Sequence, residues 1–162
     1  MGFFDKFRKK EAPVCGDDEI VAVVEGEMIS PSKITDSVFS KELLGKTIGF
    51  LPADGTIVSP VNGKVEVLFP AGHAFAVRMA DGTGLMVHVG LETVSLNGRG
   101  FKKLVKEGAA VHAGQPVVQV DLETVRAAGL DPVTMLIITE CKKQTPEFIE
   151  FGPVARGQKI LK

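Results

Sequence analysis

Two histidines that one hairpin can bring together are the residues of this chain best suited to chemistry. His73 and His88 lie in the stretch AGHAFAVRMADGTGLMVHVG, and the chain has three histidines in all. An Asp-Gly pair falls midway between them, which is a strong signal for a two-residue hairpin turn. Such a turn places His88 opposite Phe75 and His73 opposite Gly90. The imidazoles are then diagonal neighbours on one face, roughly 7–8 Å apart at the backbone and within side-chain reach.

The length of this loop decides whether the rings meet. A four-residue loop on the same centre keeps the pairing, whereas a three-residue loop shifts the register and puts the rings on opposite faces. The turn chemistry favours the two-residue loop, so we expect the imidazoles to lie together. On this hypothesis their shared face also carries Phe75, Val77 and Met86 and contains no carboxylate.

Two imidazoles in apolar surroundings cannot both be charged without a large cost in free energy. Desolvation and mutual repulsion keep both rings neutral near pH 7, which leaves nucleophilic nitrogens. The absence of an acid suits a site that accepts an anion. A pair of ordinary half-buried strand histidines is the simplest alternative, and the spacing alone does not choose between the two.

Three chemistries could use the pair. A Ser/His/Asp hydrolase needs a nucleophile elbow, and the chain has no G-x-S-x-G. A zinc enzyme needs at least three protein ligands, and the remaining histidine, His112, lies in a separate turn-rich hairpin. Phosphoryl carriage on a histidine nitrogen needs one nucleophile, one hydrogen-bond donor and a surface that a partner can cover.

Short β-branched runs, separated by Gly, Pro, Asn and Asp, must position these residues. The expected strands lie within 19–29, 56–69, 73–79, 84–90, 110–121 and 132–140. Residues 32–45 should form one or two helical turns, and a short helix should run from the N-cap Asp121 to Gly129. No helix alternates with the strands, so we expect an all-β fold. It should be a compact antiparallel β-sandwich or squat barrel with one or two short helices.

Composition indicates an ordinary soluble domain. The chain has 162 residues, 44% hydrophobic and 24% charged, with a formal net charge of −1 and no Tyr or Trp. Neither the charge nor the aromatic content suits nucleic-acid binding. There is no run of 18 apolar residues and no signal peptide pattern. Two cysteines are too few for a disulfide framework. We therefore expect a cytoplasmic monomer.

The chain divides into an expected flexible, basic-aromatic tail at 1–18 and a single domain at 19–162. Phe3, Phe4 and Phe7 would share one side of a short helix opposite the basic residues, so the tail could touch a membrane surface weakly. A disordered terminus is the alternative, because isolated helices this short are marginal in water. Cys15 falls in this tail, and Cys141, in the run MLIITEC, is expected to be a small buried residue.

Four segments occur in the order SPVNGKV, FPAGHAFAV, LMVHVGLETVSLNGRGF and VKEGAAVHAGQPVVQVD. In this order and spacing they resemble the glucose-type enzyme IIA of the bacterial phosphoenolpyruvate:sugar phosphotransferase system, from about residue 20 to the C-terminus. The resemblance implies a compact antiparallel β-sandwich without cofactor or metal. It also implies a phosphotransferase component that takes a phosphoryl group from the histidine phosphocarrier protein (HPr) and passes it to the IIB domain of a sugar permease.

The resemblance assigns roles residue by residue. His88, in VHVG, matches the phosphoryl acceptor of the family, which is modified on the tele nitrogen Nε2. His73, in GHAF, matches the partner that orients and stabilises the phosphoryl group. The apolar rim on which partner proteins dock matches Phe39, Leu43, Leu44, Phe69 and Met86, the last standing where an aromatic residue is common.

One position departs from the family. Many members have Thr two residues before the first histidine, where its hydroxyl can bond the active-site imidazole, and this chain has Ala71. A backbone carbonyl, Glu92 or water must then hold His88. Because side chains alternate along a strand, a hydroxyl at 71 would lie on the face of the histidines. We therefore expect Ala71→Thr to speed phosphoryl acceptance roughly 2–10-fold.

Two rival functions stay open. A regulatory binding module of the same fold would no longer carry phosphate. A zinc peptidase of the lysostaphin type has a similar β-rich fold, but it needs an H-x-H pair, and MVHVG holds one histidine only. The last of the four segments also resembles lipoyl and biotinyl carrier domains, although it lacks their modified lysine motif.

Overall fold

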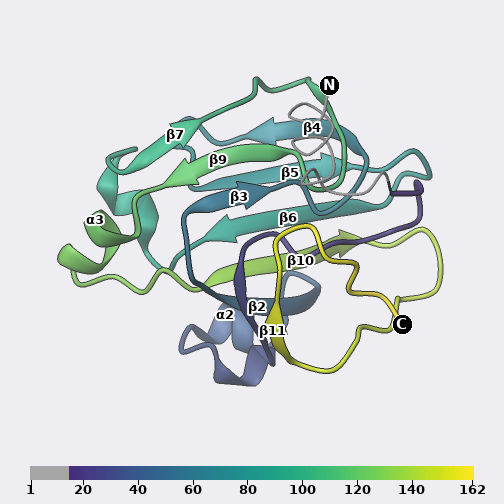
Figure 1. The fold of residues 1–162 in the computed structure, drawn as a ribbon, viewed down its shortest axis with the longest axis horizontal. Helices are drawn as coiled ribbons and strands as arrows, with labels where there is room; N and C mark the ends of the chain where they lie inside the picture. Colours follow the sequence, from purple (N-terminus) through teal and green to yellow (C-terminus); the bar gives the residue numbers. More distant parts are fainter. Residues whose placement is uncertain (1–14) are drawn as a thin grey trace, which may run out of the picture.

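The computed structural model describes residues 15–162, so the expected amphipathic helix of the tail lies outside the described residues. Two antiparallel sheets face each other across this part of the chain (Figure 1). The larger sheet has eight strands in the order β11-β1-β2-β10-β6-β5-β4-β8, and the smaller has three in the order β3-β9-β7. The predicted β-sandwich is confirmed.

The strands and helices of residues 15–162 are short. The strands are β1 (Gly26–Ile29), β2 (Lys46–Pro52), β3 (Thr56–Val58), β4 (Gly63–Leu68), β5 (Ala74–Arg78), β6 (Gly84–Val89), β7 (Phe101–Lys103), β8 (Ala110–Val111), β9 (Pro116–Val120), β10 (Thr134–Glu140) and β11 (Gly152–Val154). The helical segments are η1 (Pro31–Lys33), α2 (Ser37–Ser40), η2 (Thr93–Leu96) and α3 (Leu122–Ala127). The N-cap prediction for α3 is confirmed, because the Asp121 carboxylate accepts from the backbone N–H of Glu123 and of Thr124.

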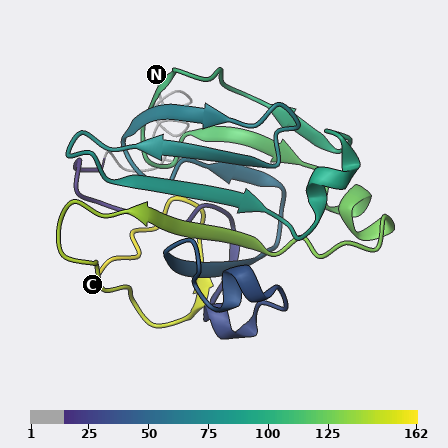
Figure 2. The same ribbon diagram turned by 180° about the vertical axis from the view of Figure 1, so that it is seen from behind.

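The apolar side chains form two main cores, on opposite faces of the larger sheet. The first lies between the sheets, and the second lies under η1 and α2 on the outer face (Figure 2). β6 alternates between them, with Leu85 and Val87 in the first core and Met86 packed against the second. Strand alternation therefore puts His88 on the outer face, the face that α2 covers.

The loop of the β5–β6 hairpin has three residues, so the predicted two-residue loop is wrong. The Met79 N–H donates to the Thr83 carbonyl over 2.8 Å, and His88 pairs with Ala74 rather than with Phe75. Gly82 occupies the left-handed position at φ +94°, which is the usual place of Gly in a three-residue loop. The shift of one residue turns Phe75 and Val77 into the first core, away from His88.

Both cysteines differ from expectation. Cys15 is buried with Val21 and Ala113, and its carbonyl accepts from the Asn62 amide over 2.7 Å. Cys15 is therefore packed against the folded domain. Cys141 is exposed, just beyond the end of β10. No helix within residues 15–162 is long and apolar enough to cross a membrane.

Candidate functional site

The imidazoles of His73 and His88 meet edge to face, with ring centroids 5.4 Å apart. A three-residue loop should have put them on opposite faces, and a bend explains why it does not. His73 lies one residue before β5, after a turn that is closed by the Gly72 N–H and the Phe69 carbonyl over 2.8 Å. Gly72 has φ +82°, which redirects the chain. The direction of the His73 side chain is therefore set by this turn and not by strand alternation. The predicted proximity of the two rings is confirmed, although the predicted register is not.

His88 is held by the main chain just beyond its own strand. Its Nδ1 lies 2.9 Å from the Gly90 carbonyl oxygen. Because a carbonyl oxygen only accepts, this contact places the proton on Nδ1 and leaves the lone pair on Nε2. Burial, followed by the neighbouring His73, lowers the pKa of His88, while the Gly90 contact and the Asp36 carboxylate oppose the shift. The half-buried ring is thus a neutral imidazole at pH 7 with a nucleophilic Nε2.

The carbonyl that holds His88 lies in a turn that only glycine fits. Gly90 has φ +82°, and a Cβ there would come within 2.4 Å of the Thr93 methyl carbon. The N–H of Gly90 donates to the Val133 carbonyl over 2.8 Å, and the N–H of Leu91 donates to the Asp131 carbonyl over 2.9 Å. The Gly90 carbonyl is therefore a fixed acceptor.

His73 is the more enclosed ring, with 5% of its surface exposed. Its Nδ1 is buried and has no hydrogen-bond partner among the described residues. The ring packs edge to face on Phe69 at 5.3 Å between centroids, and burial lowers its pKa. A buried polar atom without a partner is rare in folded proteins, and the Nδ1 of His73 is such an atom among the described residues.

Apolar side chains surround the pair, and they differ in exposure. Phe39, expected on the rim, is 8% exposed and belongs to the second core, with its ring 5.1 Å from that of His88. Phe39 therefore packs on the His88 ring rather than forming an open surface. Leu43 and Leu44 are 65% and 46% exposed, as a docking rim requires. Phe69 and Met86 are half-buried.

Two exposed apolar residues of the same segments were not predicted. Val38 precedes Phe39 in α2, and Val94, 55% exposed, lies in η2 directly after the Gly90 turn. In the sequence, Val94 is marked only by its place in the motif LETV. The structure shows that the preceding residue, Thr93, is buried. Single exposed valines are common on protein surfaces, so the sequence alone did not distinguish them.

Ala71 and Glu92 do not hold His88. Ala71 lies in the turn that precedes Gly72 and not in a strand, so the alternation argument for a hydroxyl at this position does not apply. Glu92 adopts the left-handed conformation at φ +61°, at the start of η2. Of the three candidates that the sequence offered, the backbone carbonyl fills the role, through Gly90.

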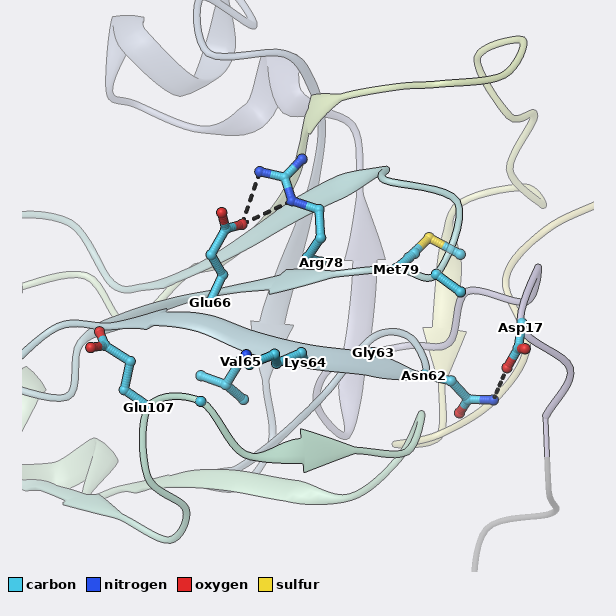
Figure 3. A pocket seen from close by; sticks show the side chains of 11 residues that line it. Asp17, Asn62, Gly63, Lys64, Val65, Glu66, Arg78, Met79 and Glu107 are labelled. Atoms are coloured by element: carbon cyan, nitrogen blue, oxygen red, sulfur yellow. Dashed lines mark hydrogen bonds and ion pairs between the residues drawn. The ribbon is translucent and has the colours of Figure 1, made fainter.

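The opposite end of β5 carries a different cluster (Figure 3). Arg78 forms an ion pair with Glu66 over 2.8 Å and another with Glu140, and it donates to the Gly82 carbonyl over 2.7 Å. Arg78 and Glu66 border a groove of about 690 Å³ whose wall also includes Lys64 and Glu107. Within residues 15–162, no three His, Cys, Asp or Glu side chains gather closely enough to hold a metal ion.

The histidine pair can therefore do one kind of chemistry well. A neutral Nε2 with a fixed orientation can attack an electrophile, and the second imidazole stands beside it to bond anionic oxygens. The exposed leucines offer a protein partner an apolar surface to cover.

Comparison with known families and structures agrees with this chemistry. The family described as "phosphoenolpyruvate-dependent sugar phosphotransferase system, EIIA 1" matches residues 18–144. The glucose-specific EIIA component of Staphylococcus epidermidis is 35% identical over 91% of this chain and 89% of its own length. The glucose permease IIA of Mycoplasma capricolum superposes with a TM-score of 0.85 at 31% identity, covering 88% of this chain and 93% of that one.

Larger proteins also contain a similar region. The glucose-specific EIICBA component of Staphylococcus carnosus is 35% identical over 93% of this chain. This chain spans about a fifth of that protein's length, 22%.

Proposed function

Because this chain belongs to the EIIA 1 family of the phosphoenolpyruvate-dependent sugar phosphotransferase system, we propose that it relays a phosphoryl group through His88. The donor is the histidine phosphocarrier protein HPr, and the acceptor is the IIB domain of a sugar permease. The observation that carries this proposal is the bond between His88 Nδ1 and the Gly90 carbonyl, which leaves Nε2 as the free nitrogen beside His73.

The transfer step follows from the protonation of the ring. The Nε2 lone pair attacks phosphorus as the bond from phosphorus to the donor nitrogen breaks, so that one N–P bond replaces another. The Nδ1 proton stays on His88 and continues to donate to the Gly90 carbonyl, which stabilises the positive charge that develops on the ring. Passing the group to the IIB domain reverses the same movements.

His73 is the electrostatic partner in this proposal. Its ring is 5.4 Å from that of His88, near enough for an N–H to donate to a phosphoryl oxygen once the group is in place. Since His73 is buried against Phe69, its ring is held in position before the phosphoryl group arrives. The neutral state of His88 suits its role as acceptor, because a protonated Nε2 would have no lone pair with which to attack phosphorus.

The docking surface is the exposed apolar group of Leu43, Leu44 and Val94, with the half-buried Phe69 and Met86 beside it. One surface serves both partners in turn, because each must bring its own phosphoryl-carrying residue to the same Nε2. Relatives that join EIIA to EIIB and EIIC in one chain support the IIB partner. The IIB domain belongs to a membrane permease and HPr is a carrier protein that must reach the same site, so the proposed location is the cytoplasm.

The test is a reconstituted relay. Purified protein, incubated with enzyme I, HPr and phosphoenolpyruvate, should gain one phosphoryl group by intact mass, and the gain should require all three components. Added IIB domain, from a panel of glucose and glucoside permeases, should then discharge it. A protein that binds HPr but gains no mass would instead be the regulatory module of the same fold.

A further inference from the structure

We propose that Thr93 is a positioning residue, which keeps the Gly90 carbonyl on His88 and so keeps Nε2 free. The effect of Thr93 on the rate of phosphoryl transfer rests on the proposed relay, whereas its effect on the tautomer of His88 does not. Thr93 is fully buried at the start of η2, and its hydroxyl bonds the main chain rather than either imidazole.

The two branches of the Thr93 side chain act on the two residues that precede the turn. Its hydroxyl donates to the Val89 carbonyl over 2.5 Å. Its methyl carbon lies where a Cβ on Gly90 would have to go, at 2.4 Å from that position. The side chain therefore anchors the residue before Gly90 and packs against Gly90 itself.

The geometry of the peptide planes explains why this matters. Each peptide unit is planar, so a bond to one of its atoms orients the whole unit. The unit between Val89 and Gly90 is held at its oxygen by Thr93 and at its N–H by the Val133 carbonyl. The next unit contains the oxygen that bonds His88, and its N–H, that of Leu91, donates to Asp131.

Glycine joins these two planes, and glycine rotates more freely than any other residue. Without the Thr93 hydroxyl, the first plane loses one of its two supports. The second plane can then turn, which lengthens the bond from Gly90 oxygen to His88 Nδ1. A ring without that bond also populates the tautomer with the proton on Nε2, and that tautomer cannot attack phosphorus.

A matched pair of substitutions tests this. Thr93→Val keeps the size and branching of the side chain and removes only the hydroxyl. Thr47→Val is the control, because Thr47 is also buried and its hydroxyl also donates to a carbonyl, that of Gly45, over 2.9 Å. Thr93→Ser keeps the hydroxyl and removes the methyl.

The readout is ¹⁵N NMR of the His88 ring in the free protein, together with rapid-quench phosphorylation by phospho-HPr. Thr93→Val should move His88 from the Nδ1-protonated toward the Nε2-protonated tautomer and lower kcat about 2–10-fold, with the KM for phospho-HPr unchanged. Thr93→Ser should keep the wild-type tautomer, and Thr47→Val should change neither measurement.

Three results overturn the proposal. They are a wild-type tautomer ratio in Thr93→Val, an equal shift in Thr47→Val, and loss of the wild-type tautomer in Thr93→Ser. If Thr93→Val does not fold, the Thr93→Ser result decides, since it retains the hydroxyl. A tautomer shift in a protein whose His88 never accepts phosphate would refute the relay and leave the positioning role intact.

Discussion

The two ends of the β5–β6 hairpin differ in how far the chain satisfies its own polar groups. At the Arg78 end, the guanidinium bonds two carboxylates and a carbonyl, which raises the pKa of Arg78 and lowers that of Glu140. At the histidine end, the rings are neutral, and one buried nitrogen has no partner in residues 15–162. The Arg78 side chain is therefore engaged within residues 15–162, whereas the His73 Nδ1 is not.

The difference shows why the size of a groove is a poor guide to function in this molecule. The groove at the Arg78 end has a volume of about 690 Å³, yet Arg78 and Glu66 in its wall already bond each other. The histidine end offers an apolar surface and, on the proposed function, a single reactive nitrogen, Nε2 of His88. A phosphoryl group that arrives on a protein needs no enclosing pocket, because the partner covers the site.

The largest expected effect removes the reactive nitrogen of the histidine end. His88→Gln should abolish acid-labile, base-stable phosphate on the protein, since no other group in the site has a neutral nitrogen that is held in place by a carbonyl. Radiolabelling with phosphoenolpyruvate, enzyme I and HPr measures this. Wild-type labelling of the variant would show that His88 is not the acceptor.

His73→Gln should separate the two imidazoles by role. A residue that only donates to phosphoryl oxygens matters more for passing the group on than for receiving it. We expect the variant to accept phosphate from HPr but to transfer it to the IIB domain about 10²-fold more slowly. Single-turnover transfer measures this, and normal onward transfer would contradict the assigned role.

The pH dependence of phosphoryl acceptance should depend on His88, at one end of the hairpin, and not on Arg78, at the other. Burial lowers the pKa of His88, so its neutral, nucleophilic form persists below the ordinary histidine value. Acceptance should be flat at pH 7 and should fall about tenfold per pH unit only below a midpoint under about 6.5. Arg78→Gln, at the satisfied end, should leave this profile unchanged. A midpoint above 6.5 would mean that burial does not control the ring.

A smaller effect should follow from the docking surface. Leu43, 65% exposed, should contribute to docking without supporting the fold, so Leu43→Ala should raise the KM for HPr by about 5-fold, or about 1 kcal/mol. Phe39→Ala is the contrast, because this ring is buried against His88. It should lower the melting temperature and raise the pKa of His88 by admitting water. An unchanged KM in Leu43→Ala would remove this residue from the rim.

The smallest effect is expected at Ala71. The sequence alone predicted that Ala71→Thr would speed acceptance, but the structure places Ala71 in a turn and gives its supposed task to Gly90. We now expect a rate within about twofold of wild type, since a second hydrogen bond would duplicate an existing one. Rapid-quench kinetics at saturating phospho-HPr would reveal a larger gain, which would show that the Gly90 bond is incomplete.

The sequence was sufficient for the sandwich, which follows from side-chain patterns. The sequence also predicted that the histidines meet, although they do so through the bend at Gly72 and not through strand alternation. It was insufficient for the hairpin register, since Asp-Gly suits a two-residue loop and equally a three-residue loop with Gly82 in the left-handed position. The sequence also did not reveal which residue holds His88. The Gly90 carbonyl belongs to the main chain, which every residue has, so no side chain marks it.

The sequence did not reveal the burial of Phe39, for a related reason. An apolar residue in a short amphipathic segment looks the same whether a core or a partner covers it. Only the second core on the outer face of the larger sheet decides between the two. Strand β2 was missed because its run, KTIGFLP, contains both Gly49 and Pro52, which usually interrupt strands.

If His88 carries the phosphoryl group as proposed, the choice of a carbonyl to hold this ring has a thermodynamic consequence. A carboxylate in the place of Gly90 oxygen could take the Nδ1 proton and leave a neutral phosphorylated ring, whose N–P bond is harder to break. A carbonyl cannot remove that proton, so the loaded ring stays an imidazolium and remains a good leaving group. The energy of the donor bond is then conserved rather than dissipated, and the relay can run in either direction.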